Sequence, residues 1–156
     1  MEEKMRRSDR QLTDYEARSI LHTGEYGVLS TCSANGIPYG TPVNYVYNDE
    51  VIYFHCAKNA GKKVRNLKEC QHVSFTAVGV TCLLPAQFGT LYESVIVEGT
   101  AREVDDSERK LALDLMIEKY SAQFKESGQD HIQGAWDRVA VYAIDPSNIT
   151  AKGRKH

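Results

Sequence analysis

Two turn signals inside a β-rich stretch constrain the fold more than any other feature of the chain. Residues 26–56 are rich in β-branched and aromatic side chains, and Asn35-Gly36 and Asn48-Asp49 interrupt them. Such pairs are typical of the tight turns of β-hairpins. The stretch therefore predicts a three-stranded antiparallel meander and argues against the parallel strands of βαβ units.

Further strands are predicted downstream. Residues 72–80 and 94–104 alternate between apolar and polar side chains, and residues 138–145 form a short apolar run. We expect residues 81–93 to form a loop, which is either a lid or dimer contact or a plain crossover. About six strands with hairpin connections predict a mainly β fold with peripheral helices, an antiparallel, Greek-key-like barrel that is closed or nearly closed.

Two helices have recognisable ends. Thr13 and Glu16 have the spacing of a capping box, and the helix that they begin is expected to stop at Gly24. A longer helix is predicted over residues 106–124, capped by Asp105 or Asp106. Its predicted apolar stripe consists of Leu113, Met116, Ile117, Tyr120 and Phe124.

The 156-residue chain suits one domain, residues 1–156, in which residues 1–11 and 153–156 are expected to be flexible tails. The basic residues at both ends fit such tails. The formal net charge is -2, so electrostatics give no reason to expect a nucleic-acid partner.

The cysteines and the hydropathy indicate the compartment. Cys32, Cys56, Cys70 and Cys82 are widely spaced and form no C-x-x-C pair, so no metal site is predicted. No segment approaches the roughly 20 apolar residues of a membrane span, and the amino terminus lacks the apolar core of a signal peptide. We therefore expect a cytoplasmic protein with reduced thiols and no membrane partner.

A lysine-rich segment follows the apolar run that ends near Cys56. Lys58, Lys62, Lys63 and Arg65 gather where a helix is expected to begin. Cations in a first turn are unfavourable beside the positive end of the helix dipole unless an anion compensates them. Gly61 allows close backbone approach, so the segment indicates a phosphate site, although a plain solvated helix face is the alternative.

The order of these elements resembles the pyridoxamine 5'-phosphate oxidase-like split-barrel flavoproteins, and most closely their nitroimidazole-resistance branch. The resemblance spans about residues 12–152. In that family the block FH-x-A…G-x-K…L grips the phosphate of flavin mononucleotide (FMN), and the segment written here GTPVNYVY runs along the isoalloxazine ring. The resemblance therefore implies an FMN-binding split barrel.

The resemblance also implies individual site residues. Lys63 stands at the phosphate-binding lysine, with Lys62 and the Gly61 backbone beside it. The other implied contacts are Val43, Asn44 and Tyr45 on the ring strand, His55 and Cys56 near the ring edge, and Ser94 and Val95 near the dimer-related cofactor. His55 is the candidate catalytic residue, as an orienting or proton-donating group. A purely structural role for His55 is the alternative.

The expected function is that of a homodimeric, FMN-dependent oxidoreductase with shared cofactor sites. It would reduce small electron-poor substrates such as nitroimidazoles, with electrons from an external reductant such as a nicotinamide nucleotide. The chain ends in NITAKGRKH and lacks the arginine-containing segment of true pyridoxamine phosphate oxidases, so that activity is not expected. The alternatives are a non-catalytic flavin or haem carrier, with His55 or His72 on the iron, and a barrel without cofactor.

Overall fold

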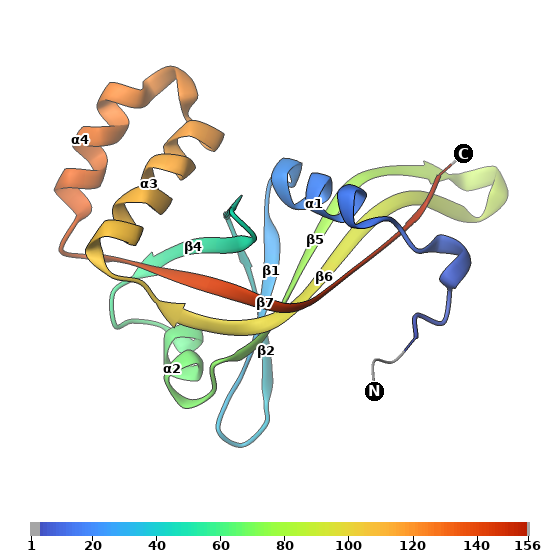
Figure 1. Ribbon diagram of the computed structural model, residues 1–156, viewed down its shortest axis with the longest axis horizontal. Coiled ribbons are helices and arrows are strands. Elements are labelled where there is room, and N and C mark those ends of the chain that lie inside the picture. Colours follow the sequence, from blue (N-terminus) through green and yellow to red (C-terminus); the bar gives the residue numbers. More distant parts are fainter. Residues whose placement is uncertain (1–3, 156) are drawn as a thin grey trace.

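Seven antiparallel strands form one bent sheet, and helices pack around it in the computed structural model, which describes residues 4–155 (Figure 1). The strands are β1 (Gly27–Cys32), β2 (Pro38–Val43), β3 (Val46–Asn48), β4 (Val51–Ala57), β5 (His72–Leu84), β6 (Gly89–Glu103) and β7 (Val139–Arg154). The helices are α1 (Asp14–Thr23), α2 (Lys62–Glu69), α3 (Asp106–Tyr120) and α4 (Lys125–Ala135), with 3-10 turns at Ser8–Arg10, Pro85–Gln87 and Ala122–Phe124.

The strand order is β2-β1-β5-β6-β7-β4-β3, and every neighbouring pair is antiparallel. Among the described residues β2 and β3 end the sheet at opposite edges, so the barrel is not closed. The predicted three-stranded meander is wrong, because β2 does not pair with β3. The turn signals are local and specify each hairpin, whereas the connection at Asn44 is held by a distant helix.

Both predicted hairpin turns are present. The β1–β2 hairpin turns at Gly36, whose φ is 78°, and the β3–β4 hairpin turns through Asp49 and Glu50, whose φ angles are 47° and 64°. Two consecutive residues with positive φ are the signature of the twisted two-residue turn that suits a hairpin. The second turn thus lies one residue further along the chain than the Asn48-Asp49 signal.

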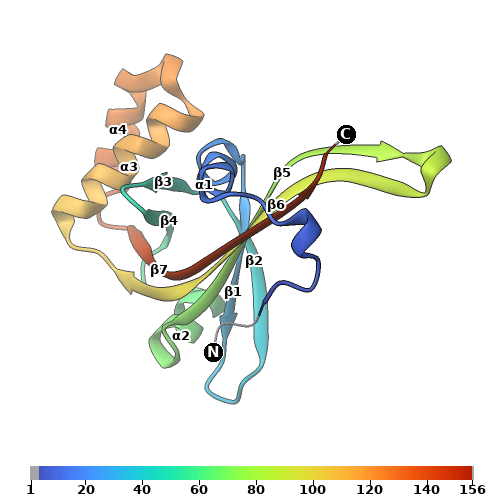
Figure 2. The ribbon, with the colours of Figure 1, turned by 45° about the vertical axis from the view of Figure 1, so that its right-hand side comes forward.

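The predicted loop at residues 81–93 is wrong. β5 continues to Leu84 and β6 begins at Gly89, so this segment is the tip of a long hairpin that projects from the body of the molecule (Figure 2). A register shift between Val78 and Thr81 interrupts the alternation on which the prediction relied. Phe88 at the tip is 98% exposed and has a φ of 49°. We call residues 78–92 the arm.

The helices are confirmed with different bounds. The capping box at Thr13 is formed and α1 ends before Gly24, as predicted. Asp105 caps α3, but this helix ends at Tyr120. Phe124 is largely exposed, so the predicted apolar stripe does not extend to it. Sequence reasoning missed α4, whose polar sequence contains two glycines. Gly128 lets α4 pack closely against α3.

Apolar residues form two clusters, on the two faces of β4. Phe54 and Cys56 point into the curve of the sheet, where they join the main core with Phe75. Tyr53 points the other way, into a second cluster beneath α3 and α4. His55 shares the face of Tyr53, because side chains alternate along a strand. The main core and the helical hairpin therefore lie on opposite faces of β4.

The two ends of the chain are more ordered than expected where they are described. Gln11 pairs with Lys152, β7 continues to Arg154, and Lys155 forms an ion pair with Glu16. Residues 1–3 and 156 of the expected tails lie outside the described residues. No helix within residues 4–155 combines the length and apolar character that crossing a bilayer would require.

Candidate functional site

The first turn of α2 has the form of an anion-binding site. Gly61 precedes it with a φ of 90°, and Lys62 and Lys63 are its first two residues. The first helical hydrogen bond is donated by Arg65 to the Gly61 carbonyl at 3.2 Å, and the preceding amides find no acceptor among residues 4–155. The turn contains no acidic residue and no side-chain cap. Unpaired amides, the positive end of the helix dipole and two lysines thus lie in one helical turn.

The two lysines reach across to neighbouring strands. The Lys62 ammonium lies 4.7 Å from the centre of the Tyr39 ring on β2, and the Lys63 ammonium lies 5.9 Å from the centre of the Phe54 ring on β4. Neither forms an ion pair with any described residue. A Cβ built on Gly61 would meet nothing within 4 Å. We call Gly61, Lys62 and Lys63 with these amides the lysine cradle.

A buried hydrogen bond fixes the cradle to the sheet. The Asn66 amide nitrogen donates to the Thr31 hydroxyl at 3.0 Å, and that hydroxyl donates to the Tyr39 carbonyl at 3.3 Å. Asn66 and Thr31 are almost completely buried. This pair orients α2 against the β1–β2 hairpin, and sequence reasoning missed it because nothing in either local pattern marks a buried polar contact.

An unpaired hydroxyl lies on the same face of β2. Thr41 is two residues beyond Tyr39, so the two side chains share one face of the strand. The Thr41 hydroxyl is buried and has no hydrogen-bond partner among residues 4–155. A buried hydroxyl without a partner is unfavourable by roughly 1–3 kcal/mol, so a polar ligand in the curve of the sheet would satisfy it.

His55 lies in a groove between the sheet and the helical hairpin. The groove has a volume of about 210 Å³. Its polar lining comes from Asn44, His55, Tyr120, Ser121 and His131, and its apolar lining from residues of α3, α4 and the start of β7. The side chain of His55 is partly exposed, but desolvation by the surrounding wall lowers its pKa below the usual 6.5, and the charges of Lys63 and His131 add to the effect. His55 is therefore mostly neutral at neutral pH.

Other predicted contacts are buried in the main core. Val43 and Tyr45 are buried in the main core, where the Tyr45 ring packs edge-on against Phe75 at 4.8 Å. Cys56 is also buried in the core, and burial raises the pKa of its thiol. Their side chains serve packing, whereas Asn44 between β2 and β3 is exposed and faces the groove.

Ser94 and Val95 lie apart from the lysine cradle within one chain. Val95 is fully buried in β6, and Ser94 lines a different hollow together with Lys4, Arg6 and Lys152. The structure thus forms two groups: Gly61, Lys62 and Lys63 lie in the first turn of α2, whereas Asn44 and His55 line the groove, where the charge of Lys63 acts on His55. Lys58 and Arg65 are exposed beside them, and exposed His72 begins β5 outside the groove.

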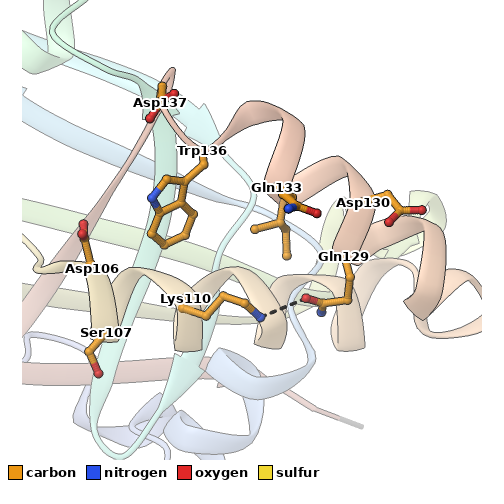
Figure 3. A pocket seen from close by; sticks show the side chains of 9 residues that line it. Asp106, Ser107, Lys110, Gln129, Asp130, Gln133, Trp136 and Asp137 are labelled. Atoms are coloured by element: carbon orange, nitrogen blue, oxygen red, sulfur yellow. Dashed lines mark hydrogen bonds between the residues drawn. The ribbon is translucent and has the colours of Figure 1, made fainter.

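Another hollow, of about 710 Å³, lies on the outer side of the α3–α4 hairpin and contains no predicted site residue (Figure 3). Its single lysine, Lys110, already bonds the Gln129 carbonyl oxygen at 2.9 Å and the Asp114 carboxylate at 2.6 Å. The remaining charged lining is acidic, from Asp106, Asp130 and Asp137. Because Lys110 is already paired, this open surface lacks the unpaired amides and unpaired lysines of the lysine cradle.

Comparison with known proteins identifies the family of the chain. Residues 13–153 match the model of a family described as pyridoxamine 5'-phosphate oxidase. No curated protein matches the chain significantly.

Solved structures share the fold. A candidate 5-nitroimidazole antibiotic resistance protein from Bacteroides thetaiotaomicron is 22% identical, with a TM-score of 0.75 over 92% of this chain and 86% of that one. A FAD-binding protein from Mesorhizobium loti is 20% identical, with a TM-score of 0.70 over 94% and 98%. A FAD and heme binding protein from Mycobacterium smegmatis is 14% identical, with a TM-score of 0.73 over 94% and 74%. The predicted split-barrel fold is confirmed.

Proposed function

The chain belongs to the pyridoxamine 5'-phosphate oxidase family, and from that premise we propose that it is a flavin-binding oxidoreductase that holds FMN. One observation carries the proposal. The first turn of α2 combines unpaired amides with Lys62 and Lys63, and it contains no carboxylate to neutralise the two lysines. A phosphate group supplies the charge and the acceptors that this turn lacks.

The residues around the cradle suit the rest of the ligand. The unpaired Thr41 hydroxyl offers a hydrogen bond inside the curve of the sheet, and Asn44 offers an amide at the edge of the groove. When bound, FMN supplies the electron transfer, as cofactors do in such proteins. The chain holds the phosphate, orients the ring and limits the access of water from the side of the helical hairpin.

His55 is the candidate proton-handling residue. Its lowered pKa keeps the imidazole neutral near pH 7, so one ring nitrogen can donate a hydrogen bond while the other accepts one. In the groove it faces His131, and a substrate placed between them can be oriented by either ring. We propose small electron-poor acceptors such as nitroimidazoles as substrates, with a nicotinamide nucleotide or another soluble reductant as the electron donor.

We further propose that the protein is a homodimer with shared cofactor sites. The arm exposes Val80, Leu83 and Phe88, which are 77%, 74% and 98% accessible. A second copy would cover these apolar side chains. It would also give Ser94 and the hollow beside it a cofactor-related role, which the single chain does not provide.

We also propose that this domain works in the cytoplasm. Its cysteines are free, as thiols are in that reducing compartment.

A flavin or haem carrier without turnover is the second candidate. It is favoured by the likeness to the FAD and heme binding protein of M. smegmatis. The groove beside His55 is small for a macrocycle, at about 210 Å³. The absorption spectrum of the purified protein, followed by titrations with FMN, FAD and haemin, tests the proposal. A flavin spectrum supports it, whereas a haem spectrum, or a colourless protein that binds no added flavin, contradicts it.

A further inference from the structure

The groove that holds His55 has a second histidine in its opposite wall. Asn44 and His55 come from the sheet side, and His131 comes from α4. The floor between them is apolar, with Met116 of α3 and Ile132 of α4 buried in it. The groove therefore combines a flat apolar surface with hydrogen-bonding groups at its rim, which is the usual composition of a small-molecule site.

We propose that this groove is the subsite for the electron acceptor and that His131 helps to determine its specificity. The inference rests on the proposed function, because Asn44 and His55 are the two expected cofactor contacts that line the groove. It assigns to α4 a role that neither the sequence pattern nor the family resemblance suggested.

The lining indicates the chemical class of the ligand. No carboxylate, lysine or arginine lines the groove, so an ionised ligand would meet no fixed charge of opposite sign. The volume of about 210 Å³ suits one small ring with a short substituent. The imidazoles of His55 and His131 can donate to ligand oxygen or nitrogen atoms. The groove thus favours small, flat, uncharged heterocycles with acceptor atoms.

The helical hairpin holds His131 in a defined place. The Arg109 guanidinium stacks on the Trp136 ring at 3.7 Å and donates to the carbonyls of Trp136 and Val139 at 2.9 and 2.8 Å. Close packing of α3 against Gly128 fixes the start of α4. These contacts lie on both sides of His131 along the chain. The subsite is therefore formed by supported elements rather than by a loop.

Two substitutions on α4 form a matched pair for the test. Ala135→Leu adds a side chain to the groove, and Gln133→Leu adds the same side chain to the outer side of the hairpin. The probe is 2-nitroimidazole, added to the protein with and without FMN, with 4-nitrobenzoate as an ionised comparison. Histidine ring signals are followed by NMR, and His131→Gln assigns the signal of His131.

We expect 2-nitroimidazole to shift the His131 signal and 4-nitrobenzoate to leave it unchanged. Ala135→Leu should abolish the shift and raise the KM for 2-nitroimidazole by about ten-fold or more, with the same FMN content, and Gln133→Leu should do neither. An unmoved His131 signal in the FMN-loaded protein, or an unchanged KM in Ala135→Leu, would overturn the subsite. A protein that binds no FMN would overturn the proposed function instead, and the His131 signal without FMN reports on the groove separately.

Discussion

The hydroxyl of Tyr120 lies 3.1 Å from the backbone nitrogen of Tyr45 and accepts its hydrogen bond. The same hydroxyl donates to the Glu25 carbonyl at 2.7 Å, and the neighbouring Lys119 ammonium donates to the Tyr45 carbonyl at 2.9 Å. The end of α3 therefore holds the segment after β2 that contains Asn44. This long-range contact takes the place of the strand pairing that β2 and β3 do not make.

Tyr120→Phe should lower the free energy of unfolding by about 1–2 kcal/mol, because it leaves the Tyr45 amide without a partner in a part-buried position. Urea denaturation measures the change. Tyr15→Phe is the control, since Tyr15 is 82% exposed and its loss should be within about 0.5 kcal/mol of zero. Equal effects of the two substitutions would show that the Tyr120 contact does not hold this segment.

Thr41→Val should change stability and ligand affinity in opposite directions. Without ligand the variant should be more stable by ~1 kcal/mol, because it removes a buried hydroxyl that has no partner. The FMN affinity should fall, because the ligand loses that hydrogen bond. Thermal unfolding and flavin-fluorescence titration measure the two effects. Thr31→Val is the control, and it should only destabilise, since the Thr31 hydroxyl is fully bonded. A Thr41→Val protein with unchanged FMN affinity would exclude Thr41 from the site.

His55→Ala should keep its FMN but turn over 2-nitroimidazole more slowly. The pKa of His55 is lowered by burial and by the charges of Lys63 and His131, so its proton becomes available only as the pH falls below about 6.5. The wild-type rate should therefore rise as the pH falls through that range, and the rate of the variant should not. His72→Ala is the control, because His72 is exposed and lies outside the groove. Equal pH profiles for wild type and His55→Ala would make His55 a packing residue.

Phe88→Ser should weaken the proposed dimer. Phe88 is 98% exposed at the tip of the arm, and burying such a side chain contributes roughly 1.5–3 kcal/mol per subunit. Sedimentation equilibrium at micromolar concentration should show a dimer for wild type and a larger monomer fraction for the variant. Phe124→Ser is the control, since Phe124 is exposed far from the arm. A wild-type monomer with full FMN affinity would contradict the shared site.

Local signals predicted the local structure well. The Asn-Gly turn, the capping box at Thr13 and the start of α2 at Lys62 each depend on a few neighbouring residues, and all three are confirmed. The prediction failed where distant elements decide. The path of the chain after β2 depends on the contact with Tyr120. In the arm, β5 and β6 continue beyond a register shift that interrupts the apolar and polar alternation, so the alternation did not reveal them.

The candidate site was predicted in part for the same reason. Gly61, Lys62 and Lys63 are adjacent in sequence and lie together at the start of α2, so their pattern was visible. The direction of the Tyr45 and Cys56 side chains depends on which face of the sheet is buried, and both point into the core. Thr41 and His131 gave no signal, because an unpaired hydroxyl and a groove between a strand and a helix exist only in the folded chain.

The central claim is that the first turn of α2 binds the phosphate of a flavin, and comparing FMN with riboflavin tests it most directly. Riboflavin lacks only the phosphate. A charge-assisted hydrogen bond contributes about 1.5–3 kcal/mol, so FMN should bind at least about ten-fold more tightly to wild type. That preference should collapse in Lys63→Ala and persist in Lys68→Ala, whose lysine lies in the last turn of the same helix and bonds Asn59. Equal affinities of wild type for FMN and riboflavin, or an undiminished preference in Lys63→Ala, would contradict the account.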